Sequence, residues 1–279
     1  MKISGFTIVR NAVKFNYPVV ASILSILPIC DEFIVNVGDS EDGTLELIQS
    51  IKSPKIRIIQ TQWDMGQGSL VLSQQTNIAL KECTGDWAFY LQSDEVIHEE
   101  DLPKIKSSME RYLGQKDIDA LRFKWFHFYG SFWRYRIDLG WYQKQDRIVR
   151  NNGEVESYGD AFGFRRVDGK PLKSRHTGAF LYHYGWVNSN EAMQKRCTNA
   201  AVIGFVDKDK NNTFTGGYGD LNRFPAYVGT HPAVMKEAVE GHQLSREDFE
   251  IIRRKSWWNP AFWLRWRCKT GRRVKERIT

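Results

Sequence analysis

The segment from Gly85 to Glu95 reads GDWAFYLQSDE, and its pattern decides the fold class. The apolar part, residues 87–91, is short and rich in aromatic side chains, which is typical of a buried β-strand. This strand ends abruptly in polar and acidic residues. Ligands of open α/β sheets bind beyond the carboxyl ends of the strands. The acidic end of this strand is therefore a candidate binding site.

On the N-terminal side of this segment, strand patterns alternate with helix patterns. The predicted strands cover residues 3–9, 32–37, 55–60 and 87–91. The predicted helices cover residues 18–27, 44–51 and 69–83. Because strands and helices alternate along the chain, the sequence predicts an α/β fold with a mostly parallel, doubly wound sheet and right-handed crossovers.

On the C-terminal side the pattern changes after a helix predicted over residues 102–113. Residues 118–186 form short aromatic and charged segments broken by glycine, which predicts a mixed arrangement of hairpins, and residues 188–205 have helical spacing. No repeat or low-complexity linker separates the two parts. We therefore expect one domain with two lobes, residues 1–115 and 116–250, followed by a tail over residues 251–279.

Composition and cysteine usage favour a protein of the reducing cytoplasm. Hydrophobic residues make up 42% of the 279 residues, which is ample for a buried core. The four cysteines are scattered without paired spacing, which argues against a disulfide framework and against a cysteine zinc site. The longest apolar stretch, residues 17–30, is too short to span a bilayer and contains Pro28. No signal peptide is apparent, so we expect a protein that at most touches a membrane.

The positive charge of the chain is concentrated in the predicted helical tail. Residues 251–279 contain ten Lys or Arg and one acidic residue, whereas the rest has 30 Lys or Arg and 32 acidic residues. Trp258, Phe262 and Trp266 share one helical face among these arginines. Tryptophan beside arginine suits an anionic membrane surface, so we expect a peripheral position at the inner face of the membrane. The alternatives are a last helix packed on the core and, least favoured, a nucleic-acid contact.

The acidic pair that ends the strand at residue 91 has two interpretations. Asp94 and Glu95 could hold a divalent cation that bridges and neutralises a diphosphate. They could equally cap the helix that follows. The residue types alone leave both interpretations open.

Four segments in order resemble family 2 glycosyltransferases with the GT-A fold. They are IVRN at 8–11, VGDSEDGT at 37–44, QTN at 75–77 and QSDE at 92–95. The resemblance implies that the donor nucleotide contacts Val9, Asn11, Asp39, Asp42, Asn77, Gln92 and Ser93. It also implies that Asp94 binds Mn²⁺ or Mg²⁺. Two positions depart from the family pattern: Gln92 replaces the first Asp of the D-x-D motif, and Thr76 replaces the usual Arg.

The second lobe contributes two candidate residues. Transfer to a hydroxyl needs a carboxylate as base, and Asp160, among small and aromatic residues, is our candidate. Glu154 and Glu156 are its competitors, and a turn-forming role for Asp160 is the structural alternative. His183 resembles the late histidine that completes the metal shell of many GT-A enzymes, although a lone histidine in an aromatic strand also suits a core position.

The resemblance implies an inverting transfer from a nucleoside-diphosphate sugar to an acceptor hydroxyl. Residues 1–115 would bind the donor and residues 116–250 the acceptor, a glycan or lipid-linked glycan of cell-surface polysaccharide or glycolipid assembly. A GDSL-type esterase is a weaker alternative, because Gly38-Asp39-Ser40 is present but no Asp-x-x-His occurs in the chain. A non-catalytic protein that binds sugar or nucleic acid is the third hypothesis.

Overall fold

The computed structural model describes residues 1–137, 141–202, 214 and 216–242. The predicted tail over residues 251–279 therefore lies outside the described residues. Nine strands form one sheet in the order β3-β2-β1-β4-β8-β6-β11-β5, with β7 paired to β6. The strands of this sheet are β1 (Ile3–Val9), β2 (Glu32–Val37), β3 (Ile56–Gln60), β4 (Trp87–Tyr90), β5 (Glu95–Ile97), β6 (Ala120–Tyr129), β7 (Tyr135–Arg136), β8 (Lys144–Arg150) and β11 (Ser174–Trp186). A separate hairpin contains β9 (Val155–Tyr158) and β10 (Gly163–Arg166).

The N-terminal half is the parallel α/β unit that the sequence predicts. Strands β3, β2, β1 and β4 are parallel to one another. They alternate along the chain with α1 (Val19–Ile26), α2 (Thr44–Gln49) and α3 (Leu70–Lys81). Each of these elements begins and ends within a few residues of its predicted bounds. The hydrophobic pattern was sufficient here because β1, β2 and β4 are buried apolar runs.

The second half is mixed, as expected, and continues the same sheet. Strand β8 is antiparallel to both β4 and β6, whereas the long β11 is parallel to β6 and antiparallel to β5. The helices of this half are α4 (Leu102–Leu113), α5 (Asn190–Val202) and α6 (Lys236–Glu240). Short 3₁₀ turns cover Leu27–Ile29, Met65–Gln67, Glu99–Asp101, Leu221–Arg223 and Ala233–Met235. The predicted fold class, a parallel unit with a mixed second lobe, is confirmed.

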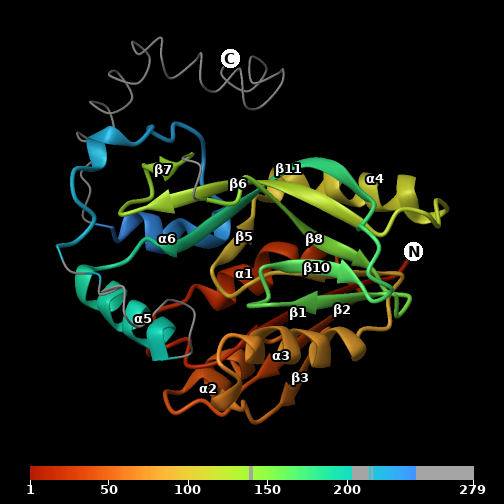
Figure 1. The fold of residues 1–279 in the computed structure, drawn as a ribbon. Coiled ribbons are helices and arrows are strands. Elements are labelled where there is room, and N and C mark those ends of the chain that lie inside the picture. The colour runs from red at the N-terminus through yellow and green to blue at the C-terminus, as the bar shows by residue number, and fades with distance from the viewer. Residues whose placement is uncertain (138–140, 203–213, 215, 243–279) are drawn as a thin grey trace.

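Two layers cover the sheet, and Figure 1 shows α3 and α4 on opposite sides of it. Residues of α1, α2 and α4 pack against one face in the largest core cluster, which contains the buried Ile23, Ile48 and Ile105. Residues of α3 and of the β9-β10 hairpin pack on the other face around Phe6 and Tyr90. Within the described ranges, no helix is both long enough and apolar enough to cross a membrane.

Strand pairing brings three polar residues of distant segments to one level of the sheet. His183 of β11 is the register partner of Glu95 in β5 and of His127 in β6. Register partners on neighbouring strands place their side chains on the same face. The acidic turn before β5 therefore faces two histidines that lie far away in the sequence.

Candidate active site

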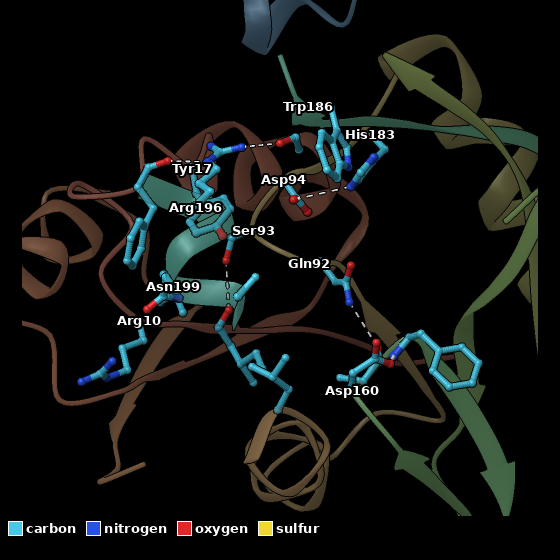
Figure 2. A pocket seen from close by; sticks show the side chains of 18 of the residues that line it. Arg10, Tyr17, Gln92, Ser93, Asp94, Asp160, His183, Trp186, Arg196 and Asn199 are labelled. Carbon is cyan, nitrogen blue, oxygen red and sulfur yellow. Dashed lines mark hydrogen bonds and ion pairs between the residues drawn. The ribbon is translucent and has the colours of Figure 1, made fainter. Parts of the chain in front are cut away.

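A cavity of about 520 Å³ lies beyond the carboxyl ends of β1 and β4. Its walls come from the end of β1, the turn after β4, strands β6, β8 and β11, the β9-β10 turn and one face of α5. Figure 2 shows Asp94, His183 and Arg196 around one part of the cavity, with Gln92 and Asp160 at another. This is the location that the sheet topology predicts for a ligand.

The turn after β4 is held in shape by a buried ion pair. Both carboxylate oxygens of Glu95 accept hydrogen bonds of 2.8 Å from the guanidinium of Arg147, and both side chains are fully buried. Burial would lower the pKa of Arg147, but the adjacent Glu95 raises it. Glu95 also accepts a hydrogen bond from the backbone N–H of Gln92. Glu95 therefore fixes the turn and does not line the cavity, whereas Gln92, Ser93 and Asp94 do.

Asp94 and His183 face one another across the cavity wall. Oδ2 of Asp94 lies 3.5 Å from Nε2 of His183, and Figure 2 shows the two side chains directed toward each other. Burial alone would raise the pKa of Asp94, but His183 in its protonated form and the charge of Arg196 outweigh it and lower the pKa. The carboxylate is therefore ionised at neutral pH, as a metal ligand must be.

The space beside this pair exists because residue 185 is glycine. A Cβ atom at Gly185 would lie 2.5 Å from Oδ2 of Asp94 and 2.7 Å from Nε2 of His183. One carboxylate oxygen and one imidazole nitrogen suit Mn²⁺ or Mg²⁺ when a diphosphate and water supply the remaining ligands. In the part of the chain that the structure describes, no group of three His, Cys, Asp or Glu could hold a metal without such help. The pair therefore fits a cation shared with a substrate.

Arg196 of α5 brings a positive charge to the same region. Its guanidinium donates to the backbone oxygens of Phe15, Asn16 and Gly185 at 2.6, 2.5 and 2.6 Å. The group lies 4.2 Å from the ring centroid of Tyr17. These acceptors are neutral, so the guanidinium keeps its positive charge, which acts on Asp94 nearby and would attract the anionic part of a ligand.

Asp160 lies in the β9-β10 turn and lines the cavity. The next residue, Ala161, is buried and has a φ of +60°, a strained conformation for a residue with a side chain. The turn is fixed from the opposite wall, because Gln92 donates to the carbonyl of Ala161 and Arg147 donates to that of Phe162. The strain and these two contacts together set the position of Asp160.

The two competing acids point elsewhere. Glu156 pairs with Arg165 at 2.7 Å, and Glu154 pairs with Arg166 at 3.3 Å. Neither glutamate lines the cavity. The structure thus places Asp160 alone of the three candidates at the site.

The predicted nucleotide contacts divide into two groups. Val9, Gln92 and Ser93 line the cavity. Asn11, Asp39, Asp42 and Asn77 do not. Asn77 exchanges two hydrogen bonds with the backbone of Ser157 and so joins α3 to β9. The neighbouring Thr76 is fully buried, and its hydroxyl donates to the carbonyl of Leu72.

The turn after β2 is closed by its own hydrogen bonds. Asp42 accepts from the backbone N–H of Lys14 and from both the backbone N–H and the hydroxyl of Thr44. Asn11 bonds to the backbone N–H of Glu41. Asp39 is exposed at the rim, where it accepts from Arg10, and Arg10 itself lines the cavity.

A comparison with protein-family models identifies the chain. The model of "Glycosyl transferase family 2" matches residues 6–183, well over half of the 279 residues. The chain belongs to glycosyl transferase family 2. The match includes the turn after β4, Asp160 and His183, and it replaces the esterase hypothesis.

Two solved structures illustrate what this chain is similar to. TarS of S. aureus is 16% identical with a TM-score of 0.43, over 72% of this chain and 39% of that chain. Glucosyl-3-phosphoglycerate synthase of Mycobacterium tuberculosis, in complex with Mn²⁺, UDP and phosphoglyceric acid, is 17% identical with a TM-score of 0.40, over 74% and 80%. The chain thus spans well under two thirds of the full TarS chain. A search of curated proteins found no match, and the family assignment rests on the family model.

Several residues of this family 2 site were not predicted from the sequence. They are Arg10, Trp63, Trp125, His127, Trp141, Arg147 and Arg196. The four aromatic rings would have been expected in the core, and an arginine on a helix is usually solvated. Arg10 alone carried a signal, because it lies within the IVRN segment that resembles the family.

Proposed function

We propose that this family 2 chain transfers a sugar from a nucleoside-diphosphate sugar to an acceptor hydroxyl, with inversion at the anomeric carbon. The observation that carries the proposal is the ionised Asp94, which faces His183 in a cavity at the carboxyl ends of the parallel strands. A diphosphate needs positive charge at that position, and Arg196 supplies one such charge from α5.

Asp94 and His183 would hold a divalent cation, Mn²⁺ or Mg²⁺. When bound, the cation would offset the charge of the diphosphate leaving group. Glu95 is not available as a further ligand, because Arg147 occupies both of its oxygens. The amide N–H of Gln92 donates to the Ala161 carbonyl. The role of Gln92 is therefore to align the turn that carries Asp160.

Asp160 would act as the base. Its carboxylate takes the proton of the acceptor hydroxyl while the acceptor oxygen forms a bond to the anomeric carbon. The bond between that carbon and the diphosphate oxygen breaks, and the diphosphate leaves with the electron pair. A single displacement of this kind inverts the configuration, and the base and the leaving group lie on opposite sides of the sugar.

The nucleotide would lie toward the end of the cavity formed by β1 and the segment after β3. Ile8, Val9, Trp63 and Met65 line this end, and Arg10 lies at its rim. Trp63 fits closely over Gly38, because a Cβ atom there would come within 2.6 Å of the indole nitrogen. A flat apolar wall of this kind suits the face of a nucleobase.

Ligand-dependent thermal unfolding tests the proposal. UDP, UDP-glucose and UDP-N-acetylglucosamine are suitable first probes, each with Mn²⁺ and with EDTA. A ligand that binds only the folded state raises the melting temperature, so at least one nucleotide should do so and should need Mn²⁺. Stabilisation by no nucleoside diphosphate or its sugar would contradict the proposal. Binding without turnover on any glycan acceptor would favour the non-catalytic alternative.

We further propose that the basic tail brings the enzyme to an anionic membrane, where a lipid-linked glycan is the acceptor. The support is the charge segregation, with ten Lys or Arg and one acid in residues 251–279. Each basic residue near an anionic surface contributes about 1 kcal/mol. The full chain should sediment with phosphatidylserine vesicles at low salt and less at high salt, and a chain ending at Lys255 should not. If the full chain does not sediment with the vesicles even at low salt, the membrane role is refuted.

A further inference from the structure

We infer that His127 is a positioning residue that accepts the Nδ1 proton of His183 and so makes Nε2 of His183, the nitrogen that faces Asp94, the one that a cation can bind. The consequence for metal binding rests on the proposed function. The assignment of the protons rests on geometry alone. His127 was not among the residues predicted from the sequence.

The two histidines meet side by side in the sheet. They are register partners on the parallel strands β6 and β11, and their Nδ1 atoms lie 3.2 Å apart. Their rings are 5.0 Å apart and inclined at 76°. His127 is 2% exposed and His183 is 9% exposed, so water does not compete strongly for this contact. Two nitrogens at this distance form a hydrogen bond only if one donates and the other accepts.

A backbone carbonyl decides which nitrogen donates. Nε2 of His127 lies 2.6 Å from the carbonyl oxygen of Tyr142. A carbonyl oxygen can only accept, so Nε2 of His127 carries a proton. His127 is 2% exposed, and its ring nitrogens meet a carbonyl oxygen and another imidazole, not a carboxylate. Burial disfavours a charged imidazole in such surroundings, so the ring is neutral and its other nitrogen is bare. Nδ1 of His127 therefore accepts, and Nδ1 of His183 donates.

This hydrogen bond determines what His183 presents to the cavity. A neutral imidazole with its proton on Nδ1 has a lone pair on Nε2. That atom lies 3.5 Å from Oδ2 of Asp94, beside the space left by Gly185. Without His127, the proton could move to Nε2, where it would bond to Asp94 and block a cation.

Neighbouring indole rings hold the arrangement in place. The ring of Trp125 lies 4.5 Å from that of His127 and 5.3 Å from that of His183. Trp141 packs against His127 from another direction at 5.0 Å, with its ring inclined at 68°. Rotation of either imidazole would require these rings to move, so the order of donors and acceptors is fixed by packing.

Two substitutions at residue 127 separate the hydrogen bond from the packing. His127→Leu removes the acceptor and keeps an apolar side chain. His127→Asn restores an acceptor, because its side-chain oxygen takes the place of Nδ1. Outer-shell substitutions weaken metal affinity about 10–100-fold, so His127→Leu should weaken Mn²⁺ binding by that factor in the presence of UDP. His127→Asn should recover most of it. Unchanged affinity in His127→Leu, or equal loss in both variants, would overturn the inference.

Nitrogen NMR of the metal-free wild-type protein, labelled with ¹⁵N-histidine, tests the proton positions directly. We expect a protonated Nδ1 on His183 and an unprotonated Nδ1 on His127. An unprotonated Nδ1 on His183 would overturn the inference whatever the metal titration shows. His183→Ala distinguishes the two proposals: if it leaves Mn²⁺ affinity unchanged, the proposed metal site is wrong, while the NMR result still decides the role of His127.

Discussion

The molecule has two acidic turns at the carboxyl ends of the parallel strands β2 and β4, and they serve different purposes. The turn after β2 directs Asp42 inward, where it accepts three hydrogen bonds from Lys14 and Thr44. The turn after β4 directs Asp94 outward toward His183 and the cavity. In sequence, both turns resemble the family pattern, although Gln92 departs from it in the second.

The difference lies in which group satisfies the backbone of each turn. In the second turn, Glu95 accepts the N–H of Gln92 and the guanidinium of Arg147, so Asp94 is left for a ligand. In the first turn, Asp42 itself accepts the hydrogen bonds that fix the loop, from Lys14 and Thr44. A short acidic side chain binds a ligand only when another group meets the local demand for an acceptor.

Asp94→Asn is expected to have the largest effect on ligand binding of the substitutions in the two turns. The amide is a poor metal ligand of nearly the same size, so the fold should persist while Mn²⁺-dependent binding of UDP is abolished. Titration of UDP with Mn²⁺ and with EDTA measures the effect. If the wild-type protein binds UDP equally well in EDTA, Asp94 does not act through a metal.

Asp160→Asn tests the residue that the second turn positions through Gln92. Loss of a general base should reduce turnover by roughly 10²–10⁴-fold, with donor affinity little changed. Steady-state kinetics with a soluble glycan acceptor provides the measurement. Glu156→Gln is the matched control, since its partner Arg165 lies away from the cavity. If Asp160→Asn keeps near-normal turnover while Glu156→Gln loses it, the assignment of Asp160 as the base is wrong.

Gly185→Ala sharpens the comparison by filling the space beside Asp94. The backbone at Gly185 is not in the left-handed region, so alanine is permitted. Its Cβ would lie 2.5 Å from Oδ2 of Asp94, which should displace the carboxylate and weaken Mn²⁺ binding roughly tenfold. Gly114→Ala, where a Cβ would meet nothing within 4 Å, should leave Mn²⁺ affinity unchanged. Equal affinities in the two variants would show that no cation occupies this space.

Asp42→Ala should have the smallest effect on ligands and a clear effect on stability. Loss of the acceptor should lower the free energy of unfolding by about 1–3 kcal/mol and change UDP affinity less than about twofold. Burial alone would raise the pKa of Asp42, but the hydrogen bonds from Lys14 and Thr44 lower it. This stabilisation is therefore present above the unfolded pKa near 3.9 and is lost as pH falls through the folded pKa.

Chemical denaturation from pH 7 to pH 3 measures this prediction. The difference between wild type and Asp42→Ala should be largest near neutral pH and should shrink in acid. A loss of UDP affinity that exceeds the loss of stability would mean that Asp42 also contacts the nucleotide.

The sequence was sufficient for the parallel half of the fold and for one wall of the site. Short apolar runs such as residues 32–37 and 87–91 are buried on both faces, so their composition alone identifies them as strands. Asp94 could be selected because it follows such a strand directly. The fate of Asn11 and Asp42 could not be predicted, because a short polar side chain near unsatisfied backbone groups bonds to them by preference.

The opposite wall depends on pairings between distant segments. The three-residue strand β5 is too short to show periodicity, and its partner β11 lies more than eighty residues away. The contact between His127 and His183 follows from the register of β6 on β11, and that register carries two shifts. No local pattern specifies such a register, so His127 and Arg196 could be recognised only in the folded molecule.

The hydrogen bonds of Arg196 also determine how the cavity can open. One guanidinium ties α5 to the segment after β1 and to the end of β11 through Phe15, Asn16 and Gly185. Helix α5 cannot swing away unless three charge-assisted bonds break together, so these segments move as one rigid body. Tyr142 also lines the cavity, where its half-exposed side chain stacks on Phe162. Exposed side chains change rotamer within nanoseconds, so an opening at Tyr142 would need no hinge motion of α5.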